Sequence, residues 1–238
     1  MRYPGGKGKS YQRIINMMPP HRVYIESHLG GGAVMRHKKP AEINIGIDID
    51  PEPLRAFEEF PTNYKFICCD AVAAINSLAL TPDTLIYADP PYLPQTRRAS
   101  RVYRHEYTST EHASILKWLR DLPCMVMISG YPSELYDEML ADWVREEFLG
   151  TSHVGLREEV VWMNFEARLL HDVRFLGDTY RDRDAGVRKR YRWKKRFQGL
   201  RKPYQQAVLT DLVSVFMSDL DKGERVRMAN LLLKGESV

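Results

Sequence analysis

The sequence predicts an α/β fold: a mostly parallel sheet with helices on both faces, followed by a small, basic, mostly helical C-terminal extension. Three observations predict it. Short runs rich in β-branched and aromatic residues alternate with helical patterns up to about Asn164. Several of these runs end in glycine or in an acidic residue, as strands do at the ligand-binding edge of such sheets. After Asn164 the alternation stops and basic residues become frequent.

The expected strands and helices follow one another along the chain. We expect strands at Val23–Glu26, Ile43–Ile49, Tyr64–Cys68, Thr84–Ala88, Met125–Ser129 and Glu158–Met163. We expect helices at Lys9–Met18, Gly32–His37, Glu52–Phe60, Ala71–Leu78, Ser109–Leu122 and Pro132–Trp143. Because the carboxyl ends of parallel strands meet at one edge, the residues that follow the strands are the candidates for a binding site.

Composition narrows the class of protein. Hydrophobic residues make up 44% and charged residues 28% of the 238 residues, as in soluble globular proteins. No apolar run is long enough for a membrane span, and the first residues do not resemble a signal peptide. The three cysteines are odd in number and lack zinc-ligand spacing. We therefore expect a cytoplasmic protein with reduced, buried thiols, no metal and no membrane partner.

The basic extension is the candidate for contact with nucleic acid. Between Arg174 and Lys202 the sequence has 12 Arg or Lys against 3 Asp, although the net charge of the whole chain is only +4. Aromatic residues interleave with these charges, which favours a nucleic-acid partner over a merely solvated surface. We expect DNA contacts from Arg190, Arg192, Trp193 and Lys194.

Two further helices should end the chain, at Tyr204–Leu220 and Lys222–Lys234. The first of them carries an apolar stripe, which consists of Leu209, Leu212, Val213, Phe216 and Leu220. Such a stripe either packs in a core or forms the contact of a homodimer.

The ends of the first three strands describe a pocket for a nucleoside. The first strand runs into a glycine-rich turn with Gly30 and Gly32, where the backbone can approach a ligand closely. After the second strand we expect Asp48 to accept hydrogen bonds from ribose hydroxyls and Asp50 to cap the next helix. The third strand ends in the same manner, at Asp70.

The fourth strand ends in Asp89-Pro90-Pro91-Tyr92. Two consecutive prolines fix the backbone as it leaves the sheet and remove two N–H donors. A carboxylate, a backbone carbonyl and an aromatic ring then lie within four residues. This combination suits a planar amine, because the two oxygens accept its hydrogens while the ring stacks on the base. An ordinary strand-exit turn is the alternative.

Together these motifs resemble the D12 class of DNA adenine-N6 methyltransferases, the group that includes Dam-like and many phage enzymes. The resemblance spans roughly Arg2 to Asn164. It implies that Asp89, Pro90, Pro91 and Tyr92 form the catalytic motif. It also implies cofactor contacts from an N-terminal motif and from the strand ends, at Tyr3, Gly5, Lys7, Glu26, Gly30, Gly32, Asp48 and Asp70.

The same resemblance implies a fold and an activity. Residues 1–165 would form a Rossmann-like, seven-stranded, S-adenosylmethionine-dependent methyltransferase sheet, and residues 166–238 a DNA-binding or oligomerisation element. The implied reaction moves a methyl group from S-adenosylmethionine to the N6 amine of a flipped adenine in double-stranded DNA. Methylation of adenine in RNA is one alternative, and a catalytically inactive DNA-binding module is another.

Two features depart from the family pattern. Ser27-His28 follow Glu26, where the family usually has Pro-Phe. The stretch between Asp70 and Asp89 is too short for the usual recognition insert. We therefore expect recognition from a mobile, DNA-facing loop at residues 93–108 and from the basic extension. Phosphate contacts of this loop are expected from Arg97, Arg98, Arg101 and Arg104.

Overall fold

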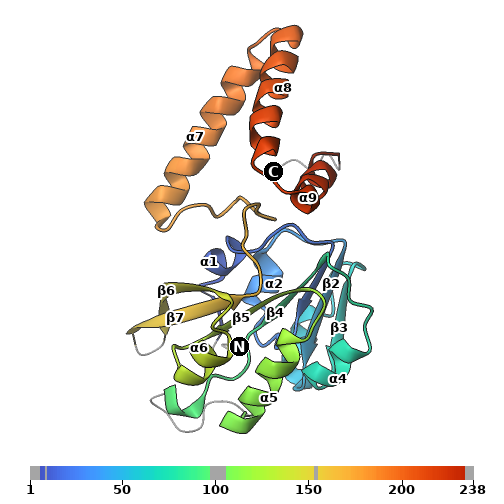
Figure 1. The fold of residues 1–238 in the computed structure, drawn as a ribbon, viewed down its shortest axis with the longest axis vertical. Coiled ribbons are helices and arrows are strands. Elements are labelled where there is room, and N and C mark those ends of the chain that lie inside the picture. Colours follow the sequence, from blue (N-terminus) through green and yellow to red (C-terminus); the bar gives the residue numbers. More distant parts are fainter. Residues whose placement is uncertain (1–5, 9, 97–105, 153–154, 234–238) are drawn as a thin grey trace. The chain divides into compact units, whose positions relative to one another are not determined.

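The computed structural model describes residues 6–8, 10–96, 106–152 and 155–233 (Figure 1). Contacts divide the chain into two compact units, Met1–Ile14 with His21–Glu166 and Ile15–Pro20 with Ala167–Val238. The sheet and the candidate site lie in the first unit. The assignment of residues 1–165 as a catalytic domain and of 166–238 as a DNA-binding or oligomerisation element stays a prediction.

The described part of the first unit contains a seven-stranded sheet with the order β3-β2-β1-β4-β5-β7-β6. The first five strands are parallel, and β7 is antiparallel to both β5 and β6. The strand order reverses between β1 and β4, which is where open α/β sheets bind ligands. The predicted α/β sheet is thus confirmed. Its strands are β1 (Val23–Glu26), β2 (Ile43–Asp48), β3 (Tyr64–Cys68), β4 (Thr84–Ala88), β5 (Met125–Gly130), β6 (Val144–Ser152) and β7 (Gly155–Met163).

Strand β6 was not expected from the residue pattern. It lies at the edge of the sheet and buries Phe148 and Gly150, whereas Arg145, Glu146 and Glu147 are exposed. Charged side chains are common on edge strands, since they discourage pairing with another chain. The charges hide the apolar alternation that predicts a strand. The helix expected just before it is also shorter, because α6 covers only Glu134–Met139.

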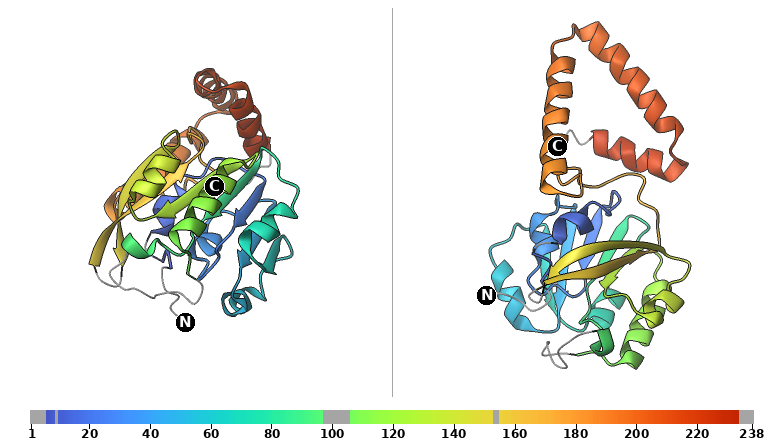
Figure 2. Two further views of the ribbon diagram at one scale, coloured as in Figure 1. Left: turned by 60° about the horizontal axis from the view of Figure 1, so that its bottom comes forward. Right: turned by 90° about the vertical axis from the view of Figure 1, so that its left-hand side faces the viewer.

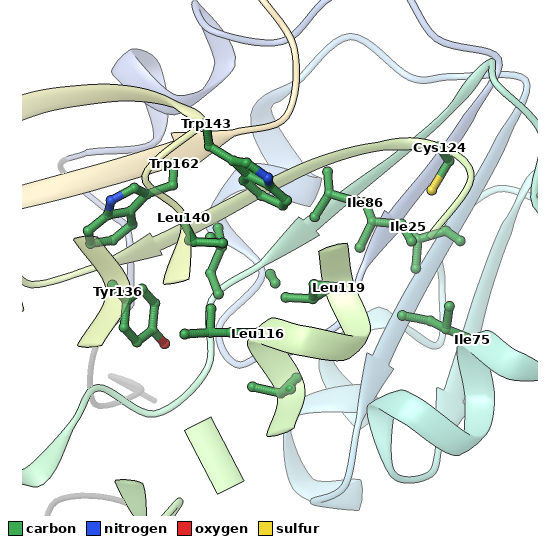
Figure 3. Close-up of a cluster of buried hydrophobic side chains, with 14 of the residues drawn as sticks. Ile25, Ile75, Ile86, Leu116, Leu119, Cys124, Tyr136, Leu140, Trp143 and Trp162 are labelled. Atoms are coloured by element: carbon green, nitrogen blue, oxygen red, sulfur yellow. The ribbon is translucent and has the colours of Figure 1, made fainter. Parts of the chain in front are cut away.

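Helices cover both faces of the sheet (Figures 1 and 2). On one face, side chains of α4, α5 and α6 pack against the strands in a hydrophobic core (Figure 3). This core includes Ile25 of β1, Ile86 of β4, Leu116 of α5 and Trp162 of β7. The helices of this unit are α1 (Tyr11–Ile15), α2 (Ala33–His37), α3 (Pro51–Leu54, continued by a 3₁₀ turn at Arg55–Phe57), α4 (Ala71–Asn76), α5 (Ser109–Arg120) and α6, with a further 3₁₀ turn at Pro94–Thr96.

The opposite face of the central strands is more polar. Successive side chains of a strand point to opposite faces, so Tyr24 and Glu26 of β1 face away from the core that contains Ile25. The Tyr24 hydroxyl donates to Glu26 Oε2 at 3.0 Å. Tyr87 on β4 pairs in register with Glu26, and its hydroxyl lies 2.9 Å from Ser129 Oγ on β5. A row of buried polar groups therefore crosses β1, β4 and β5.

The second unit contains α7 (Tyr180–Gln198), α8 (Lys202–Ser218) and α9 (Lys222–Leu233), seen from further directions in Figure 2. The two C-terminal helices were expected, but α7 was not, because its sequence has no apolar period. Leu209, Leu212 and Phe216 of the predicted stripe are exposed, and Leu220 is buried. The prediction that the stripe packs in a core is therefore wrong for those three residues. The alternative, that it forms the contact of a homodimer, stays a prediction.

Three smaller findings concern the cysteines, membrane-spanning helices and metal ligands. Cys68 is exposed at the end of β3 and Cys69 is only partly buried, so the expectation of buried thiols is correct for Cys124 alone. No helix within the described residues combines the length and the apolar sequence that crossing a membrane requires. In the same part of the chain, no three His, Cys, Asp or Glu side chains gather as metal ligands.

Candidate active site

The candidate active site lies where β4 ends, next to the reversal of the strand order. Asp89 follows Ala88, the last residue of β4. Lys7 Nζ lies 2.6 Å from each oxygen of its carboxylate, and Ser129 Oγ donates to Asp89 Oδ1 at 2.7 Å. The side chain of Asp89 is 16% exposed and that of Lys7 only 5%. Three segments far apart in sequence thus meet at one carboxylate.

The charge of Lys7 is set by its acidic neighbours. Burial acts to lower the pKa of Lys7, but the charges of Asp89, Tyr87 and Glu159 and the hydrogen bond to Asp89 outweigh it, so the pKa is raised. Lys7 therefore stays protonated throughout the physiological range. A buried charge of this kind is tolerated only when it is paired and hydrogen-bonded.

Asp89 keeps room for one more hydrogen bond. An ionised carboxylate can accept at about four lone-pair positions. Among the described residues, Asp89 accepts twice from Lys7 and once from Ser129. The fourth position, on Oδ2, can therefore accept from a ligand while the carboxylate stays fixed in place.

Aromatic rings flank this ion pair. The rings of Tyr92 and Tyr131 meet edge-on with centroids 4.4 Å apart, and Lys7 Nζ lies 4.8 Å from the centroid of Tyr92. Tyr131 follows β5, and the guanidinium of Arg157 lies 4.8 Å from its ring centroid. The sequence predicted Tyr92, but the contacts of Ser129, Tyr131 and Arg157 were missed, because each depends on strands far apart in the chain.

The glycine-rich turn and Asp48 form a second part of the site. Gly30 and Gly32 have φ values of 46° and 57°, a left-handed conformation that favours glycine. A Cβ on Gly32 would lie 2.2 Å from the ring of Phe57, so the turn also has no room for a side chain there. Asp48 Oδ2 accepts from the Gly30 N–H at 2.8 Å, and its Oδ1 accepts from the Asp50 N–H at 2.9 Å.

The two acidic residues after β2 thus differ in role. Asp50 caps α3 by accepting from the Glu52 N–H at 3.0 Å, which confirms the predicted cap. Asp48 ties the end of β2 to the glycine-rich turn, and its role toward a ribose stays a prediction. A shallow, mostly apolar hollow of about 320 Å³ adjoins the ends of β2 and β3 and reaches none of the Asp89 cluster. Its lining includes Pro51, Leu54, Phe57, Phe66 and Cys68.

Glu26 is buried beneath the site rather than displayed at its surface. The residue is 3% exposed, and Tyr24 donates to its carboxyl. Burial raises the pKa of Glu26 to about 8, aided by the charge of Asp89 and opposed by the hydrogen bonds from Tyr24 and the Met35 backbone. The side chain is therefore mostly protonated at pH 7, and its predicted contact with a cofactor remains untested.

This protonation gives a prediction for Glu26→Gln. The folded state holds a proton between the ordinary carboxyl pKa of 4.5 and about 8, and the unfolded chain does not. The wild-type free energy of unfolding should therefore fall with rising pH in this window, by up to about 1.4 kcal/mol per pH unit. Because glutamine has no such proton, the variant should gain stability relative to wild type from pH 5 to pH 8.

Urea unfolding at several pH values measures this difference. The exposed substitution Glu58→Gln is the control, and a difference that stays constant with pH would contradict the assignment.

The departure from the family pattern at Ser27-His28 has a structural counterpart. His28 Nδ1 lies 2.9 Å from Ser27 Oγ, and its Nε2 lies 3.1 Å from the Tyr107 hydroxyl. Burial lowers the pKa of His28 to about 4, so the imidazole is neutral at pH 7. Burial is the largest influence on the pKa of both His28 and Tyr107, and the negative charge of Asp70 raises both values. The carboxylate of Asp70 also caps α4 by accepting from the Ala73 N–H at 2.9 Å. Its predicted contact with the cofactor adenine is untested.

The remaining predicted residues lie elsewhere. Tyr3, Gly5, Arg97, Arg98, Arg101 and Arg104 fall outside the described residues. Arg190, Arg192, Trp193 and Lys194 are exposed on α7. Residues three and four apart share a helix face, so Arg190, Trp193 and Lys194 lie together while Arg192 lies on another side. Helix α7 carries 9 Arg or Lys and 2 Asp, and Trp193 is 62% exposed.

Comparison with known proteins finds a family profile that matches part of this unit. Residues 48–149 match the sequence profile of the D12 class N6 adenine-specific DNA methyltransferases. The matched segment includes Asp48, Asp70, Asp89, Tyr92 and Ser129. The match confirms the resemblance over these residues, which leave out the N-terminal motif and the glycine-rich turn, and it supports the methyltransferase class and S-adenosylmethionine as the cofactor. No curated protein matches the chain.

Several solved structures align with about two thirds of this chain. The N-methyltransferase NodS from Bradyrhizobium japonicum WM9 is 14% identical with a TM-score of 0.47, over 67% of this chain and 95% of that one. The 23S rRNA methyltransferase ErmE is 12% identical with a TM-score of 0.44, over 69% and 70%. The precorrin 8W decarboxylase of Methanobacterium thermoautotrophicum is 13% identical with a TM-score of 0.44, over 68% and 91%. The assignment of the fold rests on the strand order.

Proposed function

We propose that this chain, which matches the D12 class over residues 48–149, transfers a methyl group from S-adenosylmethionine to the N6 amine of adenine in double-stranded DNA. One observation carries the proposal. The Asp89 carboxylate, fixed by Lys7 and Ser129, has one acceptor position left at the switch point of the sheet.

The mechanism uses this position. The cofactor supplies an activated methyl group on a sulfonium, but adenine N6 is a poor nucleophile because its lone pair is delocalised into the ring. Asp89 Oδ2 and the Pro90 carbonyl accept the two N6 hydrogens, which pulls the nitrogen toward tetrahedral geometry and localises the pair. Asp89 also stabilises the positive charge that develops on N6. Lys7 and Ser129 hold the carboxylate, so that positioning contributes to the rate.

A base in a duplex reaches this site only after it has left the helical stack. Tyr92 is the residue on which the flipped adenine stacks, and its edge-on contact with Tyr131 fixes the orientation of its ring. Recognition of the flanking DNA belongs to the loop at 93–108 and to α7.

The residues around the glycine-rich turn fit the cofactor. Gly30 and Gly32 give the turn a left-handed backbone conformation, in which the Gly30 N–H binds Asp48 at the end of β2. Asp48, held by two backbone N–H groups, is a rigid acceptor for ribose hydroxyls. We include Tyr3, Gly5, Lys7, Glu26 and Asp70 in the cofactor site on the strength of the family pattern.

The test is methyl transfer by the purified full chain. Labelled S-adenosylmethionine is incubated with duplex DNA, with single-stranded RNA or with duplex RNA of the same sequence, and the label in each polymer is counted. The proposal expects label in DNA that requires adenine. Label confined to RNA would favour the RNA alternative, and the absence of saturable cofactor binding would favour an inactive DNA-binding module.

Helix α7 gives a prediction for DNA affinity. The triple substitution Arg190→Gln, Arg192→Gln, Lys194→Gln should weaken duplex binding at least about tenfold and lower the salt slope of log Kd by about 2 to 3. Affinity for the cofactor should not change. Fluorescence anisotropy over a salt series measures both quantities. The matched control removes three exposed charges from the catalytic unit, Arg55→Gln, Lys65→Gln and Lys117→Gln. Equal losses in both variants would remove the special role of α7.

A further inference from the structure

A second acidic side chain lies near Lys7 and Asp89 that the mechanism above does not use. Glu159 on β7 is 7% exposed. It lies on the same face of the sheet as Ser129, because Ser129 pairs with Val161 and residues two apart in a strand share a face. Ser10 Oγ donates to its Oε1 at 3.4 Å. Its Oε2 is buried and has no hydrogen-bond partner within the described residues.

The neighbouring strand leaves space for this carboxyl group. Gly150 of β6 lies on the same side, since Phe148 pairs with Glu159. A Cβ on Gly150 would lie 2.1 Å from Glu159 Oε1 and 2.6 Å from its Cδ. A side chain at position 150 would force the carboxyl group to move, so the glycine leaves the space that the acid occupies.

Among the described residues, the buried groups that interact with Lys7 carry more negative than positive charge, because the guanidinium of Arg157 lies against the Tyr131 ring and donates to the Thr96 carbonyl at 3.3 Å instead. Lys7 brings one positive charge, and it interacts with both Asp89 and Glu159. The carboxylates of Asp89 and Glu159 thus both interact with the ammonium of Lys7, but only Asp89 forms an ion pair with it. Glu26 does not add to the balance at pH 7, because its pKa of about 8 keeps it mostly protonated. Burial raises the pKa of Glu159, the positive charge of Lys7 opposes that shift, and the negative charge of Asp89 adds to it.

A buried, half-satisfied carboxylate is costly, and such groups are uncommon without a purpose. We propose that Glu159 is a second acidic residue of the active site, whose unbalanced negative charge favours the cationic sulfonium cofactor over its neutral thioether product. This inference rests on the proposed function. When the C–S bond breaks and the N–C bond forms, the sulfonium becomes a thioether and N6 releases one proton to solvent. The attraction from Glu159 is then lost, which favours exchange of product for fresh cofactor.

The experiment compares two ligands that differ by this charge. Isothermal titration calorimetry of the full chain at pH 7, where Glu26 stays mostly protonated, gives Kd for S-adenosylmethionine and for S-adenosylhomocysteine. In Glu159→Gln the preference for the cationic ligand should fall about tenfold, with the affinity for S-adenosylhomocysteine nearly unchanged. The control Glu158→Gln removes the exposed neighbouring acid and should keep the wild-type ratio.

A second variant keeps the charge and moves it. Gly150→Ala should displace the carboxyl group and lower the same ratio, even if Glu159→Gln fails to fold. Equal losses of affinity for both ligands, or an unchanged ratio in either folded variant, would overturn the role of Glu159. A wild-type chain that binds neither ligand would instead refute the proposed function.

Discussion

Replacing Asp89 by asparagine should reduce the rate of methyl transfer by at least about 100-fold while cofactor affinity changes little. The substitution keeps the size of the side chain but leaves one oxygen in place of two. Lys7 and Ser129 both donate to Oδ1 in the wild-type chain, so the one oxygen of the asparagine is already hydrogen-bonded and the side chain has no acceptor left for adenine N6. The developing positive charge also loses its counter-charge. The largest effect should therefore fall on the chemical step.

Single-turnover methylation with saturating DNA and cofactor measures this step, and calorimetry measures cofactor binding. The matched control is Asp142→Asn, which removes an exposed acid paired with Arg120 and should leave both quantities unchanged. A rate within a factor of about three of wild type in Asp89→Asn would contradict the assigned role.

Lys7→Met should be the most destabilising of the substitutions considered. It leaves Asp89 without its cation at a site where the lysine side chain is only 5% exposed. Loss of one partner of a buried pair costs about 3 kcal/mol or more in free energy of unfolding. The pKa of Lys7 is raised by folding, so this stabilisation is complete below the ordinary lysine pKa of 10.5 and declines only as the pH rises through the folded value. The cost should therefore be constant from pH 6 to pH 9.

Urea unfolding measures the cost, with the exposed substitution Lys65→Met as the control. The double variant Lys7→Met, Asp89→Asn separates the charge effect from a packing effect. Since it removes both charges, it should be more stable than Lys7→Met alone, which gives a coupling free energy of about 1 kcal/mol or more. Strictly additive losses would mean that the pair contributes no coupling to stability.

The sheet could be predicted from sequence because its central strands are apolar and end in recognisable residues. Strands β1, β2, β4 and β5 are buried on both faces or nearly so, and β3, although only partly buried, still has the apolar run Phe66-Ile67. Strand β6 could not be predicted in the same way, since its exposed residues are charged. Helix α7 was missed for a related reason. A helix without a buried face has no apolar period to read.

The candidate site, too, could be predicted only in part from the sequence. Local motifs predict which residues are chemically suited, such as Asp89 after β4 and Asp48 after β2. They do not predict which partners hold them. Lys7 lies 82 residues and Ser129 40 residues from Asp89 in sequence, and only the strand order brings the three together. Glu159 is harder still to predict, because its proposed role depends on a glycine on a neighbouring strand and on an oxygen that has no hydrogen-bond partner within the described residues.

In the proposed function Asp89, at the end of β4, directs methyl transfer to an exocyclic amine of adenine in DNA. This is tested by digesting DNA from cells that express the wild-type chain or Asp89→Asn and quantifying the methylated nucleosides by mass spectrometry. We expect N6-methyldeoxyadenosine with the wild-type chain and background levels with the variant. Equal amounts of N6-methyldeoxyadenosine with both chains, or methylation of another base, would contradict it.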